Sequence, residues 1–66
     1  MRNNLVELRH NLGLTQEEMA KLVNCTRGQW CNIEKAKRQG SADMWLLLGT
    51  KLNLSLEEIQ KLKEVS

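Results

Sequence analysis

Residues 15–34, TQEEMAKLVNCTRGQWCNIE, contain the pattern that decides the fold, two short helical segments separated by a turn. Thr15 is a good N-cap residue, and Glu18 three positions later completes the pattern of a capping box. Apolar residues then recur at the spacing of one helix face, at Met19, Leu22 and Val23. Asn24 tolerates the left-handed backbone conformation that ends many helices, so we predict that the first helix ends there.

The second segment is predicted to begin after Thr26, which is another good N-cap residue. Trp30 and Ile33 mark its apolar face. Ala20, in the first segment, is small enough to let the two helices approach closely. A helix, a turn of a few residues and a second helix form the geometry that places one helix in a DNA major groove.

Further motifs extend this pattern through most of the chain. The whole set consists of Leu8-Arg9, residues 14–20 (LTQEEMA), Thr26-Arg27, Ile33-Glu34, Lys37-Arg38, Leu48, Leu52 and residues 54–59 (LSLEEI). In order and spacing they resemble the phage repressor and Cro type of helix-turn-helix protein, also called the XRE family of transcriptional regulators. The resemblance covers roughly residues 5–60. It implies an all-α, compact five-helix domain like that of lambda repressor, with the helix-turn-helix at helices 2 and 3.

Length and composition agree with a small helical protein, and we expect residues 1–66 to form a single helix-turn-helix domain. A chain of this length buries only about 60% of its unfolded surface, so its stability is marginal. The sequence has no proline and few β-branched residues, which favours helices. It has no run of roughly 18 apolar residues and no signal peptide, so we expect a cytoplasmic protein.

The chain offers little chemistry for catalysis or metal binding. Cys25 and Cys31 lie six positions apart without a C-x-x-C motif, so we expect free thiols and no metal site. His10 is the only histidine, and nothing local orients it toward either thiol. We therefore predict no enzyme activity, no cofactor and no small-molecule ligand.

Charge is distributed unevenly along a chain whose net charge is only +2. Four basic residues, Arg27, Lys35, Lys37 and Arg38, fall within a short stretch that contains one acid, Glu34. A local basic patch suits a polyanionic partner such as nucleic acid. On charge alone, an ordinary solvated surface is an equally good interpretation.

The helix predicted at about residues 27–35 has a polar face opposite Trp30 and Ile33. That face carries Arg27, Gly28, Cys31, Asn32 and Lys35. Arginine can form two hydrogen bonds with guanine, and asparagine can form two with adenine. We therefore predict base contacts by Arg27, Gln29, Cys31 and Asn32. Two of these assignments stay open: Gln29 lies at the edge of the face, within reach of a phosphate, and Cys31 can equally be a passive thiol.

Phosphate contacts are predicted at the helix N-termini and in the basic loop, by Thr15, Gln16, Thr26, Lys35, Lys37 and Arg38. The resembling family usually has glycine directly after its recognition helix, whereas this chain has Ala36. Because alanine disfavours a positive φ, we expect the loop at residues 35–41 to depart from the family's path.

Arg9 and Glu34 both adjoin apolar faces, and the family resemblance implies that they form an ion pair across the domain. The alternative is two separate solvated charges. In the remaining helices, Asn4 with Glu7, Ser41, and Ser55 with Glu58 are predicted to cap helix starts, and Asn53 is predicted to end the fourth helix.

The sequence thus predicts a DNA-binding transcriptional regulator, with repression as the favoured role. The alternative is a protein-interaction module, an adaptor or antitoxin-like partner built on the same scaffold. Apolar residues that the predicted core does not need are Met44, Leu47, Leu56 and Val65. They suggest a weak homodimer on palindromic double-stranded DNA, although scattered surface hydrophobic residues need no such explanation.

Overall fold

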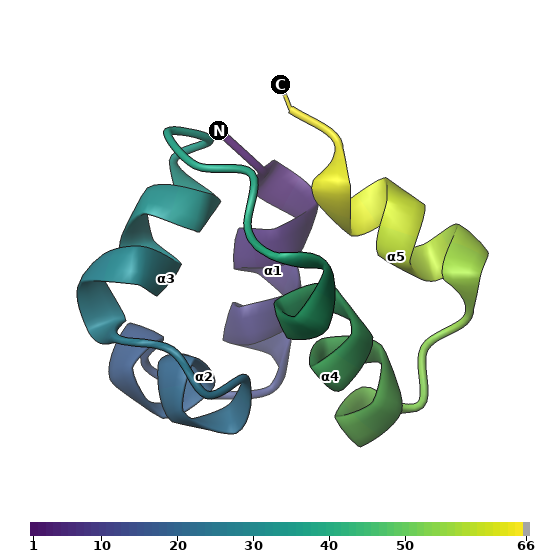
Figure 1. Ribbon diagram of the computed structural model, residues 1–66, viewed down its shortest axis with the longest axis horizontal. Coiled ribbons are helices and arrows are strands. Elements are labelled where there is room, and N and C mark those ends of the chain that lie inside the picture. The colour runs from purple at the N-terminus through teal and green to yellow at the C-terminus, as the bar shows by residue number, and fades with distance from the viewer. Residues whose placement is uncertain (66) are drawn as a thin grey trace.

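The computed structural model describes residues 1–65, and in that range it contains five α-helices and no strand. The helices are α1 (Asn3–Asn11), α2 (Gln16–Leu22), α3 (Arg27–Glu34), α4 (Ala42–Leu52) and α5 (Leu56–Lys63). In Figure 1, α2 and α3 lie on one side of α1 and α5 on the other, and the start of α1 and the end of α5 lie at the same edge. The predicted all-helical, five-helix fold is confirmed. No helix in the described residues has the length and hydropathy needed to cross a membrane.

Side-chain caps start four of the five helices. Thr15 Oγ1 accepts a hydrogen bond from Glu18 N, and Glu18 Oε1 accepts one from Thr15 N, which completes the predicted capping box. Equivalent boxes start α3 and α5, and Ser41 Oγ accepts from Met44 N at 3.1 Å to cap α4. The prediction for the first helix is wrong. No side chain caps it, and it begins one residue before Asn4, the expected cap.

The core lies where α1, α2, α3 and α4 meet, and α5 closes one side of it. Its most deeply buried members are Leu5, Met19, Trp30 and Leu48, none of which exposes any surface. Ala20 is also buried, in agreement with a close approach of α2 and α3. Gly49 likewise permits a close approach of α4 and α5, because a Cβ there would lie 3.3 Å from Ile59 Cδ1.

Met44 corrects one expectation from the sequence. We expected its side chain at the surface as a dimer contact, but it is only 5% exposed and belongs to the core. The physical reason is Gly40, whose left-handed backbone and missing side chain let Met44 fold underneath the loop. A Cβ on Gly40 would lie 2.6 Å from Met44 Cε, which leaves no room for a larger residue.

The turns depend on residues in the left-handed region. Asn24 and Asn53 have φ values of 60° and 55°, and both end helices as predicted. Ala36 also adopts a positive φ, of 65°, against the expectation that alanine would avoid it. In this conformation Ala36 N donates to Ile33 O and Lys37 N to Asn32 O, the two bonds of a Schellman motif. The two bonds satisfy the last carbonyls of α3, at the cost of strain at an alanine.

We predict that Ala36→Gly stabilises the protein by about 1 kcal/mol, because glycine reaches the left-handed region without a Cβ clash. Urea unfolding followed by tryptophan fluorescence measures the change. Ala42→Gly is the control, because Ala42 has helical geometry at the start of α4, and glycine there should destabilise. A loss of stability in Ala36→Gly would show that Ala36 is not strained.

A buried carboxylate joins the first three helices. Glu34 is 1% exposed, and its Oε2 accepts from Arg9 Nε and Trp30 Nε1, both at 2.6 Å. Its Oε1 accepts from Gln16 Nε2 at 2.9 Å. Arg9 also donates from Nη1 to Leu14 O at 3.0 Å. Arg9 and Glu34 thus form an ion pair, and neither charge is separately solvated.

Burial by itself would raise the pKa of Glu34. The hydrogen bonds from Arg9, Gln16 and Trp30, together with the charge of Arg9, outweigh burial and lower the pKa below its ordinary value. A carboxyl group whose pKa is lower in the folded than in the unfolded chain stabilises the fold above its unfolded pKa. That contribution is lost as the pH falls through the folded pKa.

We therefore predict that the free energy of unfolding falls as the pH drops below about 4.5, the ordinary glutamate value. Glu34→Gln should weaken this pH dependence and destabilise the fold at pH 7 by about 3–5 kcal/mol, because it leaves Arg9 without its carboxylate. Urea unfolding between pH 3 and pH 7 measures both effects. Glu7→Gln is the control, since Glu7 is exposed on α1 and its side chain forms no hydrogen bond in the described structure, so its loss should cost far less. Parallel pH profiles for wild type and Glu34→Gln would contradict this account.

Candidate nucleic-acid interface

Helix α3 divides into a buried and an open face. Trp30, Ile33 and Glu34 are buried against the other helices. On the opposite face Arg27, Gly28 and Lys35 are exposed, and Cys31 and Asn32 are partly exposed. Nothing lies within 4 Å of where a Cβ on Gly28 would stand, so packing does not require glycine there. The face predicted to contact bases is therefore open to solvent.

Gln29 has a local role that the sequence analysis did not assign. Its Oε1 accepts from Thr26 N at 2.9 Å, while Thr26 Oγ1 accepts from Gln29 N at 3.1 Å. The side chain thus bends back over the first turn of α3. The amide nitrogen of Gln29 has no partner in this capping box, so it can still donate to a ligand. The spacing of Thr and Gln, three positions apart, is the signal that identifies this role.

Three of the predicted phosphate contacts lie at the N-termini of α2 and α3. The hydroxyls of Thr15 and Thr26 accept backbone hydrogen bonds, which leaves each hydroxyl hydrogen available to donate. One hydrogen of Gln16 Nε2 is bound by Glu34 Oε1, and the second stays available. These side chains therefore keep donors for a phosphate while they also support the fold.

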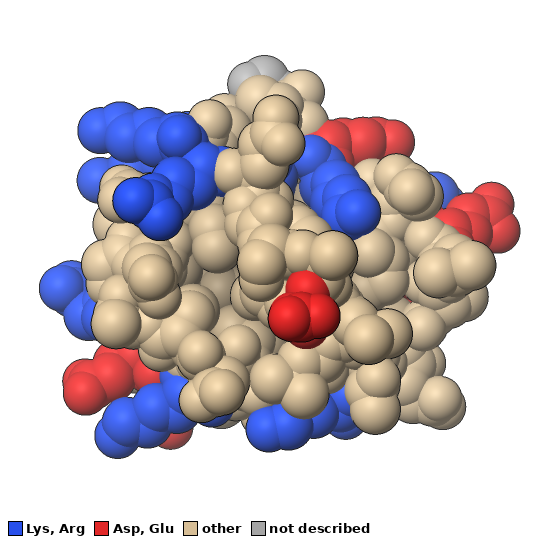
Figure 2. Space-filling view, viewed as in Figure 1, with Lys and Arg blue, Asp and Glu red and all other residues tan. Residues whose placement is uncertain are grey.

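Lys35, Lys37 and Arg38 are all exposed in the turn that follows α3. Figure 2 shows lysine and arginine side chains gathered over the end of α3 and this turn, at the upper left of the view. Glu34 does not offset this charge at the surface, because its carboxylate is buried and paired with Arg9. The surface here is therefore more basic than the count of charges along the sequence suggests.

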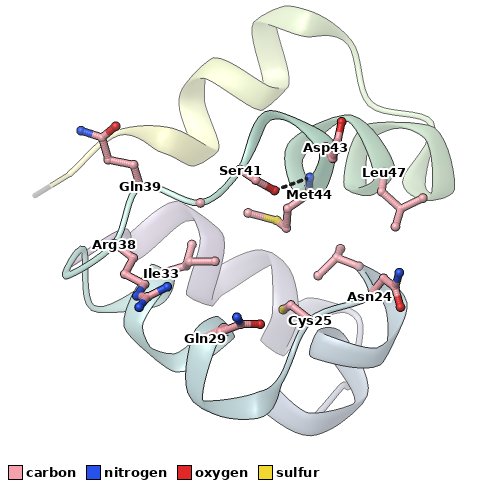
Figure 3. Close-up of a pocket in the computed structure, with 12 residues that line it drawn as sticks. Asn24, Cys25, Gln29, Ile33, Arg38, Gln39, Ser41, Asp43, Met44 and Leu47 are labelled. Carbon is pink, nitrogen blue, oxygen red and sulfur yellow. Dashed lines mark hydrogen bonds between the residues drawn. The ribbon is translucent and has the colours of Figure 1, made fainter.

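A groove of about 740 Å³ lies beside α3, between the α2–α3 turn and α4 (Figure 3). Its apolar lining includes Val23, Cys25, Ile33 and Leu47.

Burial raises the pKa of the Cys25 thiol above its ordinary value, so the thiol stays protonated and is a poor nucleophile. Both cysteines are free.

Comparison with known families agrees with the geometry. Residues 3–62 match a family model described as a helix-turn-helix domain, a range that contains α1 to α4 and nearly all of α5. No curated protein and no solved structure matches the chain. The match covers most of the sequence and includes the α2–α3 pair, in which α3 presents its open face. The chain therefore belongs to the helix-turn-helix domain family, which is typical of the XRE and Cro type of regulator.

Proposed function

We propose that this protein is a sequence-specific DNA-binding transcriptional regulator that inserts α3 into the major groove. The observation that carries the proposal is the open face of α3, where Arg27 and Asn32 stand beside an exposed basic turn. A bound domain blocks access to the DNA that it covers, so we favour repression as its role. A regulator of this kind acts in the compartment that holds its DNA, which we take to be the cytoplasm.

In this proposal Arg27 and Asn32 select the sequence. The Arg27 guanidinium is suited to guanine O6 and N7, and the Asn32 amide to adenine N6 and N7. Each such pair discriminates against a wrong base by about 1–3 kcal/mol. Cys31 lies between them on the same face and offers an apolar contact for a thymine methyl group. Gln29 donates from its free amide nitrogen at the edge of the contact.

Phosphates are held on both sides of this helix. Six residues supply donors for them, Thr15, Gln16, Thr26, Lys35, Lys37 and Arg38. Contacts of this kind set the register of the protein on the duplex but carry no direct sequence information. The two groups of residues should therefore respond differently to substitution.

We predict that Arg27→Ala and Asn32→Ala each relax specificity at individual base pairs by about 1–3 kcal/mol. Lys37→Ala should instead weaken binding to all sequences alike and reduce the salt slope by about one. Fluorescence anisotropy with duplexes of varied sequence, over a range of salt concentrations, measures both quantities. Lys51→Ala is the matched control, because Lys51 is exposed near the end of α4, away from the basic turn.

The assignment of base contacts would be wrong if Arg27→Ala and Asn32→Ala weakened every duplex equally. If the wild-type protein bound no duplex even at low salt, the proposed function itself would fail. The helix-turn-helix scaffold would then serve the alternative role, docking a partner protein.

A second part of the proposal concerns assembly. A single module of this size buries only about 600–1,000 Å² on DNA, which is little for specificity in a genome. We propose that two copies bind a palindromic site with half-sites about 34 Å apart. Of the apolar residues first considered, Leu56 and Val65 are 86% and 59% exposed, and Leu47 is partly exposed. Met44 is excluded by its burial, whereas Leu46, at 70% exposure, joins the available surface.

Because these residues offer little area, we predict a weak dimer in free solution and two protein chains per palindromic duplex. Sedimentation velocity at several protein concentrations, with and without the duplex, measures both states. Leu56→Glu should weaken the second binding event without unfolding the protein, since Leu56 contributes almost nothing to the core. One chain per palindromic duplex at excess protein would rule out the dimer.

A further inference from the structure

We propose that Arg2 positions the basic turn after α3, and thereby sets how many phosphates the protein contacts. The inference rests on the proposed DNA-binding function. Arg2 precedes the first helix and lies far in sequence from the turn, but the fold brings the two together.

Arg2 is only 5% exposed, and its polar atoms bind the backbone on both sides of the turn. Nη1 donates to Ile33 O at 2.7 Å and to Arg38 O at 2.8 Å. The backbone N of Arg2 donates to Glu34 O at 2.8 Å. A single residue therefore joins the last turn of α3 to the carbonyl of a residue that we assign to phosphate binding.

Arg2 also binds a second helix end, because its Nε donates to Lys63 O at 3.1 Å. The last residues of α3 and α5 are Glu34 and Lys63, and the carbonyls at helix C-termini carry partial negative charge. A guanidinium between two such ends is electrostatically favourable. Every acceptor that the described residues offer to its guanidinium is a backbone carbonyl, and none of them is a carboxylate. Arg2 therefore adds positive potential underneath the basic turn.

Few other contacts hold the turn. Lys37 N and Arg38 N both donate to Asn32 O, at 2.9 and 3.3 Å, and Ala36 is strained. Lys35, Lys37, Arg38 and Gln39 are exposed, so packing contributes little. Beyond the turn, Trp45 Nε1 donates to Gln39 O at 2.9 Å. Without Arg2, no described residue would donate to the carbonyl of Arg38, and the Arg38 backbone would keep only the 3.3 Å hydrogen bond from its N to Asn32 O.

The test compares Arg2→Ala with Asn4→Ala. Asn4 is the matched control because its Nδ2 also joins the start of the chain to the end of α5, at Lys61 O, but does not touch the turn. Both variants are studied at a temperature at which circular dichroism shows them folded. Salt-dependent binding to random-sequence duplex and amide hydrogen exchange at Lys37 and Arg38 are the two readouts.

Arg2→Ala should bind DNA about ten-fold more weakly, with a salt slope shallower by one to two, and should exchange the two amides faster than wild type. Asn4→Ala should change neither readout. Where Arg2→Ala does not fold, Arg2→Lys replaces it, since lysine keeps the charge but cannot bridge the same carbonyls and should give smaller changes of the same sign.

A folded Arg2 variant with the wild-type salt slope and wild-type exchange would overturn the inference. If wild-type protein bound no duplex, the proposed function would fail by itself, and the exchange rates would still show whether Arg2 holds the turn. A loss of stability equal in both variants, with no change in slope or exchange, would assign Arg2 a purely structural role and likewise overturn the inference.

Discussion

The buried carboxylate of Glu34 is the interaction on which the arrangement of the first three helices depends. It accepts hydrogen bonds from Arg9 on α1, Gln16 on α2 and Trp30 on its own helix. A buried charge is tolerated only when it is paired and hydrogen-bonded, so displacing any of these donors is costly. The network therefore fixes the rotation of α3 about its axis, and with it the residues that face outward. A purely apolar contact would hold the helices together without specifying that rotation as strictly.

The inward face of α3 serves folding, and its outward face is the one that we propose for recognition. The inward residues fill the core and bind the other helices. The two outward residues that we propose to contact bases, Arg27 and Asn32, enter no side-chain hydrogen bond in the described structure, so they can bind a ligand without first breaking one. The first turn is shared, because Thr26 caps the helix and still offers its hydroxyl hydrogen. At the other end, a strained turn held partly by Arg2 presents the basic side chains. A marginal 66-residue fold thus uses the same few polar residues for stability and for its surface.

Much of the fold was predictable because its signals are local. The capping boxes at Thr15 and Ser55 and the left-handed residues Asn24 and Asn53 each depend on neighbours a few positions away. The features that the sequence did not predict depend on backbone geometry and backbone hydrogen bonds. Within the described residues, every hydrogen bond from the Arg2 guanidinium goes to a backbone carbonyl, which every residue possesses, so no side-chain pattern in the sequence indicates it. Met44 is buried because of the turn at Gly40, and Ala36 keeps a positive φ because two hydrogen bonds close the end of α3. Of the site, the sequence predicts which residue types lie on the outer face of α3, but the bases that they contact are properties of the complex.

In the proposed function, this network presents the outer face of α3 to the bases of the major groove. Selection of bound duplexes from a random library, followed by sequencing, shows whether that face selects a sequence. We expect enrichment of one short motif, present as two inverted copies about one helical turn apart. Enrichment of a single copy of the motif would support base contacts by α3 but would contradict the proposed dimer. Binding without enrichment of any sequence, or no binding at low salt, would contradict the claim that the outer face of α3 recognises bases.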